Sequence, residues 1–136
     1  AWDTGGIRDR LRREGRLFET NAFVANGALM RLLFGSIERF VSTHRLTLSS
    51  STVLQALDAG KPVLTPDGGL VGHRTRHNGL GMTYRYFDDR DLAEKWREFR
   101  RIPPERYAPA IASFMRRFSR AEVARTFLGL LTGDNT

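Results

Sequence analysis

The sequence predicts an α/β fold, a Rossmann-like parallel sheet flanked by helices, with a helical C-terminus. Short apolar segments at 40–42, 63–65 and 80–84 are typical of buried strands. Segments with helical spacing separate them, and strands that alternate with helices are typical of βαβ units, whose strands run parallel. With 136 residues, the chain is expected to form one domain over 1–136.

The N-terminal third begins with 1–6, which resemble a strand-to-helix turn. A charged helix is predicted over 7–14, with Gly15 as its C-terminal cap. Residues 17–24 favour β-structure and predict a strand followed by a loop. Asn26 can cap the next helix, whose apolar stripe is formed by Leu29, Leu32 and Leu33.

The middle of the chain has clearer boundaries. A helix is predicted from residue 50 or 51 to 59, because Gly60 can end it and Pro62 prevents its continuation. A turn at 66–69 and a short helix over 70–77 then separate the second strand from the third.

The C-terminal third is predicted to be purely helical. Asp88 or Asp89 caps a helix whose apolar residues recur at helical spacing, and Pro103-Pro104 breaks it. Ser119 and Glu122 form a capping box at the start of the last helix. The apolar face of that helix could dock on this domain or on a neighbouring one; it contains Val123, Phe127, Leu130 and Leu131.

Composition excludes several classes of protein. The chain has no cysteine, which excludes disulfides, thiolate metal sites and cysteine nucleophiles. No apolar run approaches the ~20 residues that span a bilayer, and the sequence does not start with a signal-peptide pattern. We therefore expect a cytoplasmic protein that contacts membranes only peripherally, if at all.

The net charge of +7 indicates an anionic partner. Only Lys61 and Lys95 are lysines among the 22 basic residues, so arginine dominates. The arginines are mostly interleaved with carboxylates, as at 8–10 and 94–98. This pattern is more typical of solvated helix faces than of one stripe that follows a nucleic-acid backbone.

The best candidate for a binding site lies in the segment 43–81. A strand ends, a serine-rich loop follows, and a helix begins, so unpaired backbone N–H groups and hydroxyls gather at one point beyond the sheet. The helix dipole adds about half a positive charge there, which suits a phosphate. Ser51 and Gln55 share one face of the helix. The alternative to a phosphate site is an ordinary helix that is capped by serine and has Gln55 in solvent.

Several motifs of this chain resemble the donor-nucleotide-binding, C-terminal domain of group 1 (family 4-like) glycosyltransferases, which have the two-domain GT-B architecture. The resemblance extends over most of the chain from about residue 20. The matching segments are 32–41, 49–57, the Asp58-Ala59-Gly60-Lys61-Pro62-Val63-Leu64 stretch, Gly68-Gly69 and 78–81. It implies a transferase that uses a nucleotide-diphosphate sugar and needs no metal or other cofactor.

The resemblance also implies roles for individual residues. Gln55 stands where the family usually has a glutamate that binds the ribose hydroxyls, and Thr47 stands where a second glutamate contacts the donor sugar. Gly68 and Gly69 would allow close backbone approach near that sugar. The donor phosphates would be surrounded by Ser49, Ser50, Ser51 and Thr52, with Arg45 either a further phosphate partner or an exposed loop arginine.

A chain of this length accommodates one GT-B lobe. We therefore expect a fragment of a larger two-domain transferase, separated from its N-terminal acceptor-binding domain and inactive alone. No general base is assigned. Two rival hypotheses are a non-catalytic basic module that binds nucleic acid or protein, and a degenerate scaffold that binds no nucleotide.

His73 and His77 have a spacing that can bind metal, but no acidic or thiol ligand is near them in sequence, which favours surface histidines.

Overall fold

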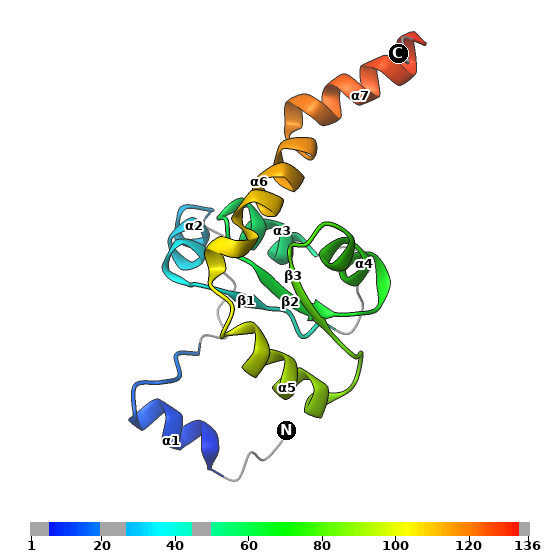
Figure 1. Cartoon of the computed structure of the whole chain (residues 1–136). Coiled ribbons are helices and arrows are strands. Elements are labelled where there is room, and N and C mark those ends of the chain that lie inside the picture. Colours follow the sequence, from blue (N-terminus) through cyan, green and yellow to red (C-terminus); the bar gives the residue numbers. More distant parts are fainter. Residues whose placement is uncertain (1–5, 20–26, 45–49, 134–136) are drawn as a thin grey trace.

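The computed structural model describes residues 6–19, 27–44 and 50–133 (Figure 1). Its centre is a three-stranded parallel sheet in the order β1-β2-β3. The strands are β1 (Phe40–Val41), β2 (Val63–Pro66) and β3 (Gly81–Tyr84). The predicted α/β fold with a parallel sheet is confirmed.

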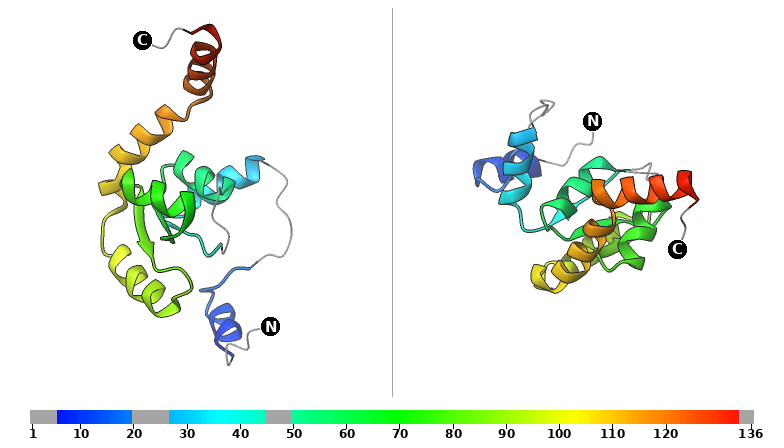
Figure 2. Two further views of the ribbon diagram at one scale, coloured as in Figure 1. Left: turned by 90° about the vertical axis from the view of Figure 1, so that its right-hand side faces the viewer. Right: turned by 90° about the horizontal axis from the view of Figure 1, so that it is seen from above.

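Helices follow each strand and cover both faces of the sheet. The helices of the described residues are α1 (Ile7–Arg13), α2 (Gly27–Ser36), α3 (Ser51–Asp58), α4 (Gly69–His77), α5 (Asp89–Phe99), the 3-10 helix η1 (Pro104–Tyr107), α6 (Ala108–Arg117) and α7 (Arg120–Thr132). Helices α2, α3, α4 and α6 lie on one side of the sheet, and α5 lies on the other (Figures 1 and 2).

Strand β2 is the centre of the core, and all of its residues are buried. Successive side chains of a strand point to opposite faces. Val63 therefore contacts the cluster formed with α3 and α6, which includes Leu57 and Phe114. Leu64 faces the other way, toward Phe99 of α5. Because β2 is covered on both faces, its residues are not alternately apolar and polar. Val63 and Leu64 are both apolar, and Thr65 is buried as well.

Close contact between β2 and β3 depends on Gly81. Val63 is paired with Gly81 in the parallel register. A Cβ on Gly81 would lie 1.8 Å from the Val63 carbonyl oxygen, a distance that no side chain tolerates. Only glycine at this position lets β3 approach β2 with this geometry.

Several predicted helix boundaries are confirmed by capping contacts. The Ser50 hydroxyl accepts a hydrogen bond from the Val53 N–H, and α3 ends at Asp58. Asp88, not Asp89, caps α5. Ser119 caps α7 by accepting from the Glu122 N–H, which is one half of the predicted capping box; the Ser119 N–H donates to the Arg116 carbonyl oxygen.

Two expectations for the N-terminal half need correction. Residues 17–19 form no strand, and 20–24 lie outside the described residues. Helix α2 does not bury its leucine stripe: Leu32 is 71% exposed, and Leu29 and Leu33 are also exposed. Phe34 enters the core instead, because α2 turns a different face toward α3.

The last helix, α7, extends away from the sheet (Figures 1 and 2). Its predicted apolar residues are exposed, with Leu131 at 68% and Phe127 at 60%. Helix α6, which the sequence analysis did not delimit, connects it to the core through Ile111 and Phe114. Within the described residues, no helix has both the length and the apolarity to cross a bilayer.

The unequal burial of two leucines gives a first prediction. Leu57→Ala should lower the free energy of unfolding by about 2–5 kcal/mol, because it leaves a cavity in the main core. Leu131→Ala should change it by no more than about 0.5 kcal/mol, because that side chain is exposed. Urea denaturation followed by circular dichroism measures both values. Equal losses in the two variants would contradict the described position of α7.

A second prediction concerns alkaline pH. Burial, together with the nearby Asp89 carboxylate, raises the pKa of Tyr84, whose hydroxyl donates to the Ser42 carbonyl oxygen at 3.0 Å. The folded state therefore holds this proton more tightly than the unfolded state. The contribution of this proton to the free energy of unfolding is fully present below the unfolded tyrosine pKa of about 10. It is lost as pH rises through the folded pKa.

Tyr84→Phe should therefore reduce the loss of stability between neutral pH and strongly alkaline pH, while costing about 1 kcal/mol at neutral pH through the lost hydrogen bond. Urea denaturation at a series of pH values measures this. Tyr86→Phe, which changes an exposed tyrosine that makes the smallest contribution to the raised Tyr84 pKa, is the comparison variant and should change the slope less. An unchanged alkaline slope in Tyr84→Phe would contradict the prediction.

Candidate functional site

The site begins where β1 ends. Parallel strands place their carboxyl ends at one edge of the sheet, and a helix that connects two parallel strands starts at that edge. Helix α3 connects β1 to β2, so its N-terminus lies at the carboxyl edge. Helix α4 connects β2 to β3 and begins at the same edge.

The first turn of α3 contains hydrogen-bond donors that remain available. Ser50 satisfies the Val53 N–H with its hydroxyl and the Leu54 N–H with its carbonyl. The N–H groups of Ser51 and Thr52 have no acceptor among the described residues. Both side-chain hydroxyls also lie in this turn, so amides, hydroxyls and the positive end of the helix dipole coincide.

Helix α3 divides its faces as the sequence analysis predicted. Val53 and Leu57 are buried against the sheet, and Gln55 is exposed. Ser51, Thr52 and Gln55 line one open cleft between α3 and α2, with a volume of about 700 Å³. Small-molecule sites typically occupy a few hundred to about a thousand Å³, so this volume suits a nucleotide. We call it the α2–α3 cleft.

Sequence reasoning missed Arg31, which lines the α2–α3 cleft from α2. Several arginines of the described residues pair with carboxylates, whereas no hydrogen bond or ion pair of the Arg31 side chain occurs among those residues. Its helical neighbours Met30 and Phe34 form an apolar floor in the same cleft. No local motif marks Arg31, because its role depends on the packing of α2 against α3.

The two ends of the α2–α3 cleft differ in electrostatic character, one being positive and the other negative. Thr52 and Ser51 lie at the N-terminal end, where the helix dipole is positive. Asp58 lines the cleft at the C-terminal end of the helix, and Gln55 lies between them. An anionic group is therefore favoured at one end, and hydroxyl groups that can donate to a carboxylate are favoured at the other.

The other predicted site residues have different positions. Ser50 caps α3 and does not line the α2–α3 cleft. Gly68 and Gly69 form the start of α4 at the same edge of the sheet, and Gly69 has a positive φ of 66° that favours glycine. They also lie outside the lining of that cleft. Three further predicted residues, Arg45, Thr47 and Ser49, are outside the described residues.

The two histidines of α4 form a stacked pair. The His73 and His77 rings lie 5.5 Å apart, centroid to centroid. No group of three or more histidine, aspartate or glutamate residues that could hold a metal ion occurs in the part of the chain that the structure describes.

Comparison with known proteins gives no match for this chain. No protein-family model matches it, and neither the curated proteins nor the solved structures give a match. Any functional assignment therefore depends on the geometry of the site and on the residues that line it.

Proposed function

We propose that this chain is the donor-binding domain of a GT-B glycosyltransferase and that the α2–α3 cleft binds the nucleotide diphosphate of a sugar donor. The supporting observation is that three residues singled out from sequence, Ser51, Thr52 and Gln55, line one cleft of suitable volume. The resemblance of the motifs to group 1 transferases supports the same function.

In this proposal the phosphates lie at the N-terminal end of α3. The N–H groups and hydroxyls of Ser51 and Thr52 donate to phosphate oxygens, and the Arg31 guanidinium neutralises part of their charge. Because these donors belong to a helix terminus, they are fixed before the reaction. Such donors stabilise the negative charge that develops on a departing diphosphate without reorganising.

The ribose lies one helical turn further along α3. Gln55 is four residues after Ser51 on the same face, and Asp58 follows on the cleft side. The Gln55 carboxamide and the Asp58 carboxylate can both accept hydrogen bonds from ribose hydroxyls. Met30 and Phe34 offer an apolar surface on which a nucleobase can rest.

The remaining parts of the proposal concern the rest of the enzyme. A second lobe binds the acceptor, and the reaction takes place between the lobes. A cytoplasmic location, where nucleotide sugars are available, is part of the same proposal.

Nucleotide titration tests this function. Isothermal titration calorimetry with uridine diphosphate and guanosine diphosphate should detect binding of one of them in the micromolar to millimolar range. Arg31→Gln should weaken binding about tenfold, because it removes a charged hydrogen-bond donor from the phosphates. Gln55→Ala should also weaken binding, through the ribose.

Arg13→Gln is the matched control, because it removes the same charge from α1, away from the cleft. It should leave nucleotide affinity unchanged. Equal losses in Arg13→Gln and Arg31→Gln, with steep salt dependence and binding to any polyanion, would favour the rival basic module. Absence of binding by either nucleotide would favour the degenerate scaffold.

A further inference from the structure

A second cleft lies at the carboxyl edge of the sheet, on the side covered by α5. Its volume is about 400 Å³. The ends of all three strands contribute to it, through His44 after β1, Pro66 of β2 and Tyr84 of β3. The turn between β3 and α5 completes the lining with Tyr86, Phe87 and Asp89, among others. We call it the edge cleft.

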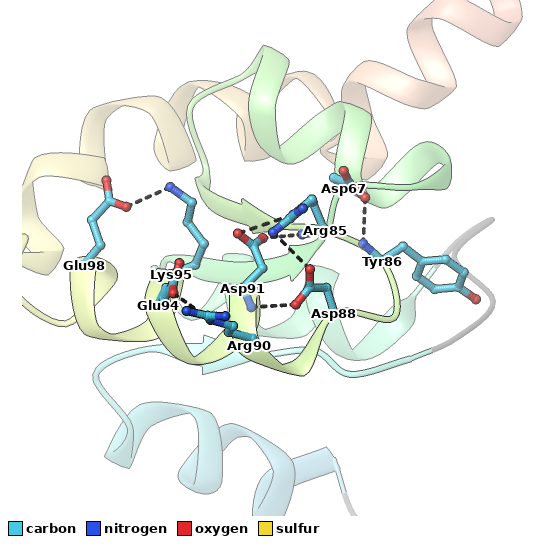
Figure 3. A network of polar contacts seen from close by, with 9 residues as sticks. All are labelled: Asp67, Arg85, Tyr86, Asp88, Arg90, Asp91, Glu94, Lys95 and Glu98. Atoms are coloured by element: carbon cyan, nitrogen blue, oxygen red, sulfur yellow. Dashed lines mark hydrogen bonds and ion pairs between the residues drawn. The ribbon is translucent and has the colours of Figure 1, made fainter.

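Ion pairs and hydrogen bonds hold the turn that forms the outer wall of this cleft (Figure 3). The Arg85 guanidinium lies 3.0 Å from the Asp88 carboxylate, and the Arg85 N–H donates to Asp91. The Tyr86 N–H donates to the Asp67 carboxylate at 3.0 Å, which ties the turn to the end of β2. In Figure 3 the Tyr86 ring points away from this network. The backbone is thus fixed from inside while an aromatic ring is directed outward.

The next residue has an unfavourable backbone conformation. Phe87 has a φ of 61°, in the left-handed region that bulky side chains rarely adopt. Its ring is 4.1 Å from the Tyr86 ring, centroid to centroid, with a tilt of 57°. Phe87 is 68% exposed. Strained backbone of this kind persists where the surroundings determine it, and it is concentrated at ligand-binding positions.

The charges of the described residues that line the edge cleft disfavour a phosphate ligand. Among the described residues, the lining of the cleft contains Asp88 and Asp89 but no arginine or lysine, although the chain has a net charge of +7. The negative charge of these carboxylates is partly offset by the N-terminus of α5, where the helix dipole is positive. The cleft therefore has little net preference for a cation, and it favours a neutral ligand with hydroxyl groups.

We propose that the edge cleft binds a pyranose ring of a neutral carbohydrate. One face of such a ring is a patch of C–H groups, which can rest on the exposed aromatic pair of Tyr86 and Phe87. Its hydroxyls can donate to the Asp89 carboxylate and exchange hydrogen bonds with Thr43, both of which line the cleft. This site lies across the sheet from the α2–α3 cleft and does not depend on the proposed nucleotide site.

The test uses the full chain labelled with ¹⁵N and titrated with methyl α-D-glucopyranoside and methyl β-D-galactopyranoside. Either glycoside should shift the backbone amide resonances of residues 85–89 in a saturable manner, with a dissociation constant in the millimolar range. Phe87→Gly should weaken this binding about five- to tenfold, since it removes one stacking ring. Glycine also suits the positive φ, so this variant should fold at least as stably as the parent chain.

Phe127→Ala is the matched control, because it removes an exposed aromatic ring on α7. It should leave the response to glycoside unchanged. Absence of saturable shifts with both glycosides, or equal binding by Phe87→Gly and the parent chain, would overturn the proposal. If uridine shifts residues 85–89 while both glycosides leave them unchanged, the cleft is a nucleobase site and the carbohydrate assignment is wrong. None of these outcomes affects the Arg31-dependent binding of nucleotide diphosphates, so the two proposals fail separately.

Discussion

The burial of β2 is the constraint on which the rest of the structure depends. Its residues are inaccessible from both faces, so α3 and α6 must cover one side and α5 the other. Gly81 lets β3 approach until its backbone touches that of Val63. Together these contacts fix three parallel strands, and parallel strands place the starts of α3, α4 and α5 at one edge. The edge cleft exists because that edge collects chain segments that are distant in sequence, whereas the α2–α3 cleft reaches the edge only at the start of α3.

The two clefts differ in chemistry because different elements line them. Helix α3 offers hydroxyls and available amides, and α2 adds the Arg31 guanidinium, so the α2–α3 cleft favours an anion at one end. On the other side of the sheet, the start of α5 brings carboxylates, and the preceding turn brings Tyr86 and Phe87. Aspartates at a helix N-terminus stabilise the helix itself. The acidic character of the edge cleft is thus partly a consequence of how α5 is capped.

Local sequence signals predicted the central βαβ units well. Gly60 adopts the left-handed conformation in which helices end, Pro62 cannot continue a helix, and Ser50 caps one through its own hydroxyl. The boundaries of α3 therefore followed from neighbouring residues. The face that α2 turns inward did not follow, because Phe34 competes with the leucine stripe and the outcome depends on the surface that α3 presents. Arg31 was missed for the same reason. The role of a side chain in a cleft between two helices is decided by tertiary packing, which has no local motif.

Asp67 contacts segments on both faces of the sheet at its carboxyl edge. Its N–H donates to the Tyr84 carbonyl, its carbonyl accepts from Arg76 of α4, and its carboxylate accepts from the Tyr86 N–H. One residue at the end of β2 thereby holds α4 on one face and the β3–α5 turn on the other. Since each partner uses a different group of Asp67, these contacts do not compete. A ligand in the edge cleft would meet a turn that is already positioned, and so would lose little free energy in ordering it.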